Sequence, residues 1–482
     1  MSQFYYPNIV IGAGAAGLVI AIGLAKAGKK VLLVEAANFG GDCTNYGCVP
    51  SKALIAAAKQ AHALKNAKKY GLDFSIEKME TKGALRYCQE KVQHFLAHEN
   101  QQELQKIGVE SAEATASFLD PNSLKLSFKD GKEKIVRGKN IVITTGSKPF
   151  IPKIEGLEKI PFLTNESIFA MDEIPKSLMI LGAGPIGCEM AQAFSRLGSK
   201  ITLVHSKDQI LEREEKATAD RLSQILQSEG IEIFFSAKAK KFKQEDGKLV
   251  LSLRQQDGTI IEKSAEKLLI ACGRRPNLKS LCLEKAGISF DEEKGIQTDA
   301  YGRCIKKHIW AAGDASGGAF YTHMAEHDAR VILSNLILPW PLKFTLDSKQ
   351  AVPSVSYTEP ELASIGMREK EAVEKYGEKN IVSYEVDLSK VDRAVIAGKD
   401  EGLIKIVSKK WSGKILGASI LSPRGGEMLL EISVAMKAKL SLSNLSQIIH
   451  PYPAYSRGLR KSADGWLLKT IIPSLKRFFG LA

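Results

Sequence analysis

Short apolar runs alternate with helix-like patterns in the first part of the chain. Residues 8–11 form an apolar run that ends at Gly12, residues 13–28 carry apolar positions at helical spacing, and residues 30–35 form a second apolar run. A buried parallel strand, a glycine turn, a helix and a second strand produce this pattern. It predicts the first unit of a doubly wound sheet of the dinucleotide-binding type.

The same pattern returns at residues 178–205, so one chain carries two such units. Between them, residues 53–106 have the pattern of charged helices and residues 108–145 that of short strands. A further apolar strand ends in the Gly-Asp pair of residues 308–315, and strands and a helix follow from residue 352. We predict an α/β protein with two doubly wound Rossmann-type domains and a C-terminal α+β domain. The predicted boundaries are residues 1–152 with 279–347, residues 153–278, and residues 348–482.

The composition is that of an ordinary globular protein, with 44% hydrophobic and 25% charged residues among 482. The net charge of +14 is spread along the chain without interleaved aromatic residues. It therefore indicates a solvated surface that attracts anionic ligands, rather than a nucleic-acid site.

The location of the protein is constrained by three features. The N-terminus lacks a basic region before its short apolar run, so it does not resemble a signal peptide. No apolar stretch reaches the roughly 18–20 residues that a spanning helix needs, and seven cysteines are too few for a secreted disulfide scaffold. We therefore expect a cytoplasmic protein.

The first glycine motif has the spacing of a dinucleotide cradle. Gly12 permits a tight turn, Gly14 lets the backbone approach a pyrophosphate, and Gly17 lets the helix pack on the strand. Glu35 ends the next strand, where a carboxylate can accept hydrogen bonds from a ribose.

The second glycine motif consists of Gly182, Gly184 and Gly187. The position equivalent to Glu35 is His205, so both a ribose acceptor and a repulsion against a 2′-phosphate are missing. Lys207 and Arg213 follow and could bind that phosphate. We favour NADPH over NADH on this basis. A surface histidine with two solvated cations is the alternative.

Two cysteines lie between the two units, in the segment GGDCTNYGCVPSK. In a regular helix, residues five apart are separated by about 7.5 Å of rise alone, which exceeds the roughly 7 Å Cα separation that a disulfide tolerates. A bridge between Cys43 and Cys48 therefore needs a break in the helix, for which Gly47 is the predicted place. A thiol at a helix start is also reactive, because its pKa is lowered there.

Taken together, these motifs resemble the FAD-dependent pyridine nucleotide–disulfide oxidoreductases, which include glutathione reductase, dihydrolipoamide dehydrogenase and mercuric reductase. The resemblance covers nearly the whole chain and is nearest to the mercuric reductase-like branch. It rests on both glycine motifs, the cysteine segment, TTGSKP (144–149), ACGRRPN (271–277), AAGDA (311–315), VPSVSYTEPELASIG (352–366) and HPYP (450–453).

The resemblance implies a role for each predicted domain. The first, formed by residues 1–152 and 279–347, would bind FAD, the second would bind NAD(P), and the third would form a homodimer. The residues implied for FAD are Gly12, Gly14, Gly17, Glu35, Gly41, Lys52, Gly146 and Asp314. Those expected for NAD(P) are Gly182, Gly184, Gly187, His205, Lys207, Arg213 and Gly273.

The resemblance also implies a reaction. A hydride would pass from NAD(P)H to FAD, which would open a Cys43–Cys48 disulfide, with Cys48 on the flavin side and Cys43 attacking the acceptor. Lys52 would pair with Glu189 beside the flavin. His450 would act as acid and base toward the partner subunit, but Arg457 stands where we expect the glutamate that holds it.

Because an arginine cannot accept the imidazole N–H, efficient thiol–disulfide chemistry is in question, and the acceptor stays unassigned. The alternatives are a metal-ion reductase of mercuric type, a dihydrolipoamide dehydrogenase and a low-turnover flavin-binding redox sensor. No cysteine follows Cys304, so we expect no metal delivery by tail cysteines. The other five cysteines lack metal-ligand spacing, and we expect them to pack without a resident metal: Cys88, Cys188, Cys272, Cys282 and Cys304.

The C-terminal segment WLLKTIIPSLKRFFGLA is apolar and basic. A membrane surface and the partner subunit are two candidate contacts for it. We expect Pro473 to interrupt the helix, which favours the partner subunit.

Overall fold

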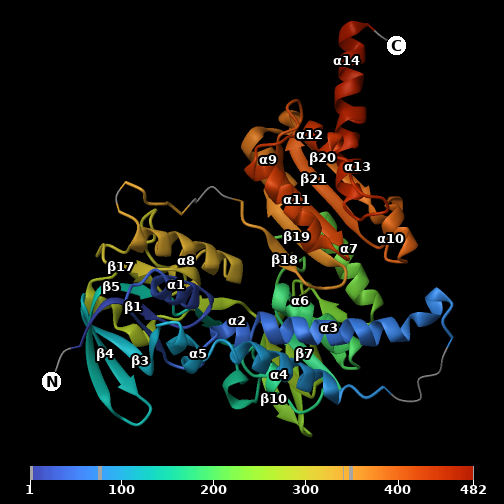
Figure 1. Cartoon of the computed structure of the whole chain (residues 1–482). Coiled ribbons are helices and arrows are strands. Elements are labelled where there is room, and N and C mark those ends of the chain that lie inside the picture. The colour runs from blue at the N-terminus through green and yellow to red at the C-terminus, as the bar shows by residue number, and fades with distance from the viewer. Residues whose placement is uncertain (1–3, 74–78, 340, 347–350, 481–482) are drawn as a thin grey trace.

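The computed structural model describes residues 4–73, 79–339, 341–346 and 351–480, and three main sheets organise them (Figure 1). The first sheet has β1 in parallel with both β2 and β5, and β17 returns beside β5 with Ile309 opposite Ile141. The chain therefore leaves this sheet, forms the second one, and comes back. The elements are β1 (Phe4–Ile11), β2 (Val31–Glu35), β3 (Glu110–Asp120), β4 (Ser123–Phe128), β5 (Glu133–Ile143) and β17 (Ile309–Ala311), with α1 (Ala15–Lys26) and α8 (Thr322–Ile337) packed together.

The second sheet is fully parallel, in the order β13-β7-β8-β9. Its strands are almost wholly apolar because both faces are covered. The strands are β7 (Ser177–Leu181), β8 (Lys200–Val204), β9 (Glu232–Phe234) and β13 (Lys267–Ile270), with helices α6 (Pro185–Arg196) and α7 (Lys216–Ser228) and an antiparallel layer of β10 (Lys238–Glu245), β11 (Lys248–Arg254) and β12 (Ile260–Ala265).

Helices link the two parallel sheets and carry the cysteine segment. α2 (Gly41–Asn45) and α3 (Cys48–Lys65) follow the first unit, and α3 packs against both α4 (Lys82–Leu96) and α6 of the second unit. α5 (Gln101–Lys106) leads back into the first sheet. The two connections between the units pair with each other as β6 (Ser147–Pro149) and β14 (Arg274–Pro276). A small hairpin, β15 (Phe290–Asp291) with β16 (Gly295–Ile296), follows.

The C-terminal sheet has the order β18-β19-β22-β21-β20 and is antiparallel throughout. Its strands are β18 (Ser354–Ser356), β19 (Glu361–Gly366), β20 (Ile381–Asp387), β21 (Leu403–Lys409) and β22 (Ile415–Ser422). Its helices are α9 (Glu369–Tyr376), α10 (Asp392–Ile396), α11 (Gly425–Lys437), α12 (Leu442–Gln447), α13 (Arg457–Trp466) and α14 (Ile472–Phe479). The predicted fold class of two doubly wound units and a C-terminal α+β unit is confirmed.

Two local predictions are wrong. Pro473 does not end the last helical segment, which passes through a π-helical turn at Leu467–Ile471 just before this proline and continues as α14. Cys272 is not a packing residue. It follows the end of β13 and is exposed, whereas Cys88, Cys188 and Cys304 are buried as expected and Cys282 is half-buried.

Candidate functional site

The first glycine motif forms a cradle that leaves no room for a side chain at its first and third glycines. A Cβ on Gly12 would lie 2.4 Å from the carbonyl oxygen of Thr144, and one on Gly17 would lie 1.8 Å from the carbonyl oxygen of Gly12. Glu35 lies at the end of β2, and its carboxylate accepts the backbone N–H of Ala13 at 2.7 Å. The N-terminus of α1 therefore opens onto this cradle, which suits an anionic phosphate.

The backbone of the cysteine segment packs closely against this cradle. Gly41 has a φ of +61°, and a Cβ there would lie 2.5 Å from the Cα of Gly14. The N–H of Gly40 also donates to the carbonyl oxygen of Ala13 at 2.9 Å. The backbone that leads into Cys43 is thus held against the glycine cradle.

A polar network joins this segment to the crossing between the two units. The Arg274 guanidinium contacts Asp42 at 3.1 Å and donates to the Ser147 hydroxyl at 2.7 Å. That hydroxyl donates in turn to the carboxylate of Asp314. Gly146 precedes Ser147 with a φ of +67° and an open Cβ position. The two predicted residues Gly146 and Asp314 therefore converge beside the first cradle.

The second cradle repeats the first, with a histidine in place of the carboxylate. Cβ atoms on Gly182 and Gly187 would lie 2.3 Å and 1.9 Å from backbone carbonyl oxygens. The N–H of Ala183 donates to Nδ1 of His205 at 3.3 Å, as Ala13 does to Glu35. Because burial lowers the pKa of His205, the ring is neutral at pH 7 and its Nε2 carries the hydrogen. That Nε2 is buried and makes no hydrogen bond of ordinary length, and the backbone of Gln209 lies close enough to act on the pKa of the ring.

The other residues predicted for the second cradle are less closely assembled. Gly184 and Gly273 have open space where a Cβ would be. Lys207 is exposed and pairs weakly with Glu212 at 3.8 Å. Arg213 is exposed as well, and its charge acts on the pKa of Tyr321.

The two cysteines lie on either side of a helix break. α2 ends at Asn45, Gly47 has non-helical dihedral angles, and α3 begins at Cys48. The predicted break at Gly47 is therefore present. Both cysteines are thiols in this structure, and the Cys48 Sγ lies 3.4 Å from the Thr322 hydroxyl at the start of α8.

The two thiols differ in their proton affinity. A hydrogen bond from Cys43, a second from Thr322 and the charge of Lys52 together lower the pKa of Cys48 to about 6, against the opposing effect of burial. The hydrogen bond to Cys48 and burial raise the pKa of Cys43. At neutral pH the pair therefore holds its negative charge on Cys48.

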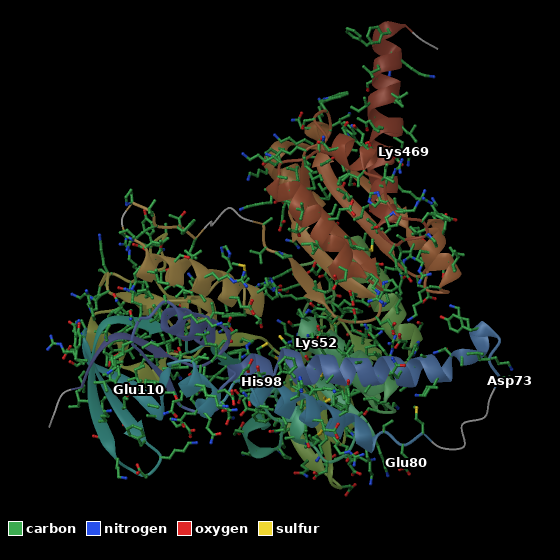
Figure 2. All side chains as sticks on the ribbon, viewed as in Figure 1. Lys52, Asp73, Glu80, His98, Glu110 and Lys469 are labelled. Carbon is green, nitrogen blue, oxygen red and sulfur yellow. The ribbon has the colours of Figure 1, made fainter. Side chains whose placement is uncertain are left out.

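Lys52, labelled in Figure 2, lies on α3 one helical turn after Cys48. A buried carboxylate holds its ammonium. Its ammonium lies 2.8 Å from Glu189 on α6, and the other oxygen of Glu189 accepts the N–H of Tyr357 at 2.9 Å. The Lys52 Nζ also lies 4.7 Å from the centre of the Tyr357 ring. Burial alone would lower the pKa of Lys52, but the attraction of Glu189 outweighs burial, and the pKa of Lys52 is raised. A stable cation therefore faces the thiol pair.

The charge on Cys48 gives a direct pH prediction. In the chemically reduced protein, alkylation of Cys48 by iodoacetamide should have a midpoint near pH 6 and fall as the pH drops below it, because only the thiolate reacts. Thr322→Val removes one hydrogen bond to the thiolate and should raise the midpoint. Peptide mass spectrometry across pH 4–10 reports the rate at Cys48 alone. A wild-type midpoint near the ordinary thiol value of 9.0 would contradict this assignment.

His450 is held by a carboxylate that the sequence analysis missed. Its Nε2 lies 2.9 Å from Glu431 on α11, and its Nδ1 lies 3.0 Å from the carbonyl oxygen of Ile448. The side chain is only 4% exposed within its own chain. Arg457 does not face it, because the guanidinium lies 4.9 Å from the ring centre of Tyr452. The expectation that His450 lacks a carboxylate partner because of Arg457 is therefore wrong.

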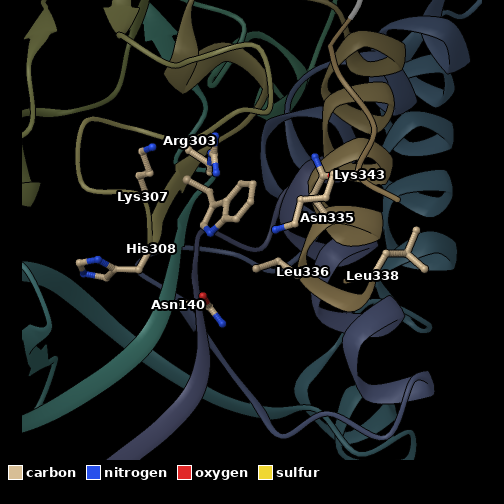
Figure 3. A pocket seen from close by; sticks show the side chains of 9 residues that line it. Asn140, Arg303, Lys307, His308, Asn335, Leu336, Leu338 and Lys343 are labelled. Carbon is tan, nitrogen blue, oxygen red and sulfur yellow. The ribbon is translucent and has the colours of Figure 1, made fainter. Parts of the chain in front are cut away.

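A separate hollow lies at the far end of the first sheet and contains none of the predicted site residues (Figure 3). Cationic side chains line it, but Arg303 is already paired with Asp299 at 2.8 Å. His308 is bonded to the carbonyl oxygen of Pro121. Among the described residues, no group of three or more histidine, cysteine or acidic side chains could hold a metal ion.

Comparison with protein families identifies the chain. Residues 6–329 match the family model described as pyridine nucleotide-disulphide oxidoreductase. The chain belongs to the pyridine nucleotide-disulphide oxidoreductase family. Residues 352–463 match the dimerisation domain of the same family, which supports a homodimer.

Known proteins similar to this family member extend over almost all of its length. A mercuric reductase of Streptomyces lividans is 30% identical over 463 residues, covering 95% of this chain and 96% of the relative. A dihydrolipoyl dehydrogenase of Thermus scotoductus is 34% identical and covers 98% and 99%. A Cu(II) complex of the HOCl-induced flavoprotein disulfide reductase RclA from Escherichia coli has a TM-score of 0.86 at 28% identity, covering 96% and 99%.

Family membership makes the protein an FAD-dependent NAD(P)H oxidoreductase. The residues fit both groups, because Gly14 and Gly184 leave the space of a Cβ open at a helix N-terminus, where a pyrophosphate must approach. The side chain of His205 also turns a buried Nε2 toward the second cradle without a hydrogen bond of ordinary length. No helix of the described chain is long and apolar enough to cross a membrane.

Proposed function

We propose that the protein passes electrons from NAD(P)H through FAD to a Cys43–Cys48 disulfide and from there to a disulfide acceptor. One observation supports the proposal. Cys48 begins α3, its pKa is lowered in part by the charge of Lys52, and Lys52 is paired with buried Glu189. A thiolate stabilised beside a fixed cation is what a reversible dithiol needs on the side that faces an electron carrier. A cysteine that only packs in the core would need neither a stabilised thiolate nor a nearby cation.

The cofactors would be held by the residues of the two cradles. FAD would bind at Gly12, Gly14, Gly17, Glu35, Gly41, Lys52, Gly146 and Asp314, and the nicotinamide dinucleotide at Gly182, Gly184, Gly187, His205 and Gly273. When bound, FAD supplies two-electron chemistry between the nicotinamide and the cysteine pair. Lys52 would stabilise negative charge beside it, with Glu189 and Tyr357 fixing the direction of the ammonium.

The two cysteines would have different tasks. At neutral pH, two electrons and one proton convert their disulfide to one thiol and one thiolate, and the thiolate is Cys48 because its pKa is lowered. Cys43 keeps its proton, since its pKa is raised. To attack an acceptor disulfide, Cys43 must lose that proton to a base. We propose that the partner subunit's His450 is this base, with Glu431 as its positioning residue. Both ring nitrogens face acceptors of their own chain, Glu431 and the Ile448 carbonyl oxygen, so the ring must give up one of these contacts to take the proton.

A second candidate function is metal-ion reduction at the cysteine pair. It is favoured by the structural similarity to the Cu(II) complex of RclA and by the similarity to mercuric reductases. Cys48 is exposed and Cys43 half-buried, so a thiophilic ion can reach the pair. Acceptor assays with glutathione disulfide, lipoamide and Cu(II) separate the two functions. Turnover with a disulfide supports the first, turnover with Cu(II) alone supports the second, and failure with all three contradicts both.

For the nicotinamide cofactor we propose NADPH. The buried N–H of His205 and the nearby Lys207 offer donors to a 2′-phosphate, whereas Glu35 in the first cradle can only accept. His205→Glu should lower kcat/KM for NADPH by about 100-fold, the order expected for a lost hydrogen bond to a charged group, and affect NADH much less. Lys129→Gln, an exposed cation far along the first sheet, makes the same change in net charge and should alter neither. A strong wild-type preference for NADH overturns the proposal.

We also propose the domain boundaries 1–152 with 279–347, 153–278 and 348–482, since the three sheets fall within them. A cytoplasmic location is proposed because a disulfide that must open repeatedly suits a reducing compartment.

A further inference from the structure

The chain ends in one continuous helical segment whose base is fixed to the C-terminal sheet. α13 runs into a π-helical turn at Leu467–Ile471 and then into α14. Leu467 and Ile471 pack against the core of the sheet, and the hydroxyl of Thr470 bonds to that of Tyr384. Beyond this anchor, α14 extends away from the body of the protein, as Figures 1 and 2 show.

The outer face of this segment is strongly apolar. Leu468, Ile472, Leu475 and Phe479 follow each other at spacings of four, three and four residues, which places them on one helix face. Leu468 is 62% exposed, Phe478 81% and Phe479 64%. We call this face, from Leu468 to Phe479, the C-terminal stripe; it is about 16 Å long. The described chain provides nothing that covers it.

The charges beside the stripe are all positive. Lys469, Lys476 and Arg477 lie on this segment, and no aspartate or glutamate follows Asp464. Two copies of the segment packed together would bring like charges close, which opposes self-association. A surface that carries negative charge and accepts apolar side chains matches both features.

The segment is also distinct from the family's dimerisation domain. That domain ends at residue 463, before the stripe begins. It has an exposed apolar face of its own, with Leu430 and Val434 on α11 and Ile449 beside His450. This face within the family domain is therefore the candidate subunit contact, and the C-terminal stripe is not needed for it.

We propose that residues 467–479 lie in the headgroup region of an anionic lipid membrane and attach the enzyme to its surface. The stripe enters the boundary between headgroups and acyl chains, while Lys469, Lys476 and Arg477 contact lipid phosphates. Attachment is peripheral, in agreement with the lack of a spanning helix in the described chain. We thus propose a membrane surface as the contact of this segment, in place of the partner subunit that the sequence pattern favoured.

Vesicle sedimentation of the full-length FAD-loaded enzyme tests the proposal. The enzyme should sediment with vesicles of phosphatidylcholine and phosphatidylglycerol and stay in solution with phosphatidylcholine alone. Neutralising Lys469, Lys476 and Arg477 to Gln should weaken binding by about 100-fold, since each cation near an anionic surface contributes about fivefold. L475S/F479S should abolish it. Ile305→Ser, which removes an exposed apolar side chain elsewhere, should leave it unchanged.

Two outcomes overturn the proposal. One is an enzyme that stays in solution with anionic vesicles, or sediments equally well as L475S/F479S. The other is a change from dimer to monomer in L475S/F479S, measured by analytical ultracentrifugation, which would make the stripe a subunit contact. NAD(P)H oxidation in solution should be the same in all of these variants, which separates this test from that of the proposed function.

Discussion

Cys43→Ser and Cys48→Ser should each reduce NAD(P)H-dependent turnover of a disulfide acceptor to the uncatalysed background. Neither variant can form the intramolecular disulfide, so electrons from the flavin have no dithiol to enter. Steady-state oxidation of NADPH with glutathione disulfide or lipoamide, whichever the wild type uses, measures the loss. Cys282→Ser is the matched control, because Cys282 is a half-buried thiol away from both cradles. It should retain wild-type turnover.

The same variants distinguish the two thiols. Cys43→Ser leaves the Cys48 thiolate beside Lys52 and Thr322, and the serine hydroxyl can donate to it in place of the Cys43 thiol, so its alkylation should still follow a lowered pKa. Substantial disulfide turnover in either serine variant would contradict the assignment of this pair as the redox centre.

His450→Gln should lower turnover with a disulfide by about 10²–10⁴-fold, the usual contribution of a general acid and base. Glu431→Gln should lower it by about 10–100-fold, because a hydrogen bond to a charged carboxylate is replaced by a neutral one. Glu427→Gln removes an exposed carboxylate one turn earlier on α11 and serves as the control.

The acceptor separates a chemical role of this pair from a structural one. Reduction of a disulfide takes up two protons, whereas a one-electron acceptor such as ferricyanide takes up none. The NADPH–ferricyanide rate should therefore stay at the wild-type value in His450→Gln and Glu431→Gln. An equal loss with both acceptors would mean that the pair only maintains the fold.

Features that depend on local spacing could be predicted from the sequence. The glycine motifs determine a turn, a close backbone approach and a helix contact within six residues, so the two cradles and their place after β1 and β7 follow from the pattern. The break at Gly47 follows in the same way from the five-residue distance between the cysteines.

Features that depend on tertiary contacts could not be predicted. Thr322 reaches Cys48 from 274 positions away, and Glu431 holds His450 from another helix. The family resemblance implies a glutamate partner seven residues after the histidine, where this chain has Arg457, which contacts Tyr452 instead. The neutral state of His205 likewise depends on burial, which spacing does not report.

The redox state of Cys43 and Cys48 before and after reduction tests the central claim most directly. The oxidised enzyme is treated with NADPH, or NADH, under anaerobic conditions, labelled with N-ethylmaleimide after denaturation, and digested for mass spectrometry. We predict that both cysteines are unlabelled before reduction, joined as one disulfide, and that both are labelled afterwards. If the labelling of Cys43 and Cys48 is the same before and after reduction while the flavin is bleached, the pair takes no electrons and the proposed function is wrong.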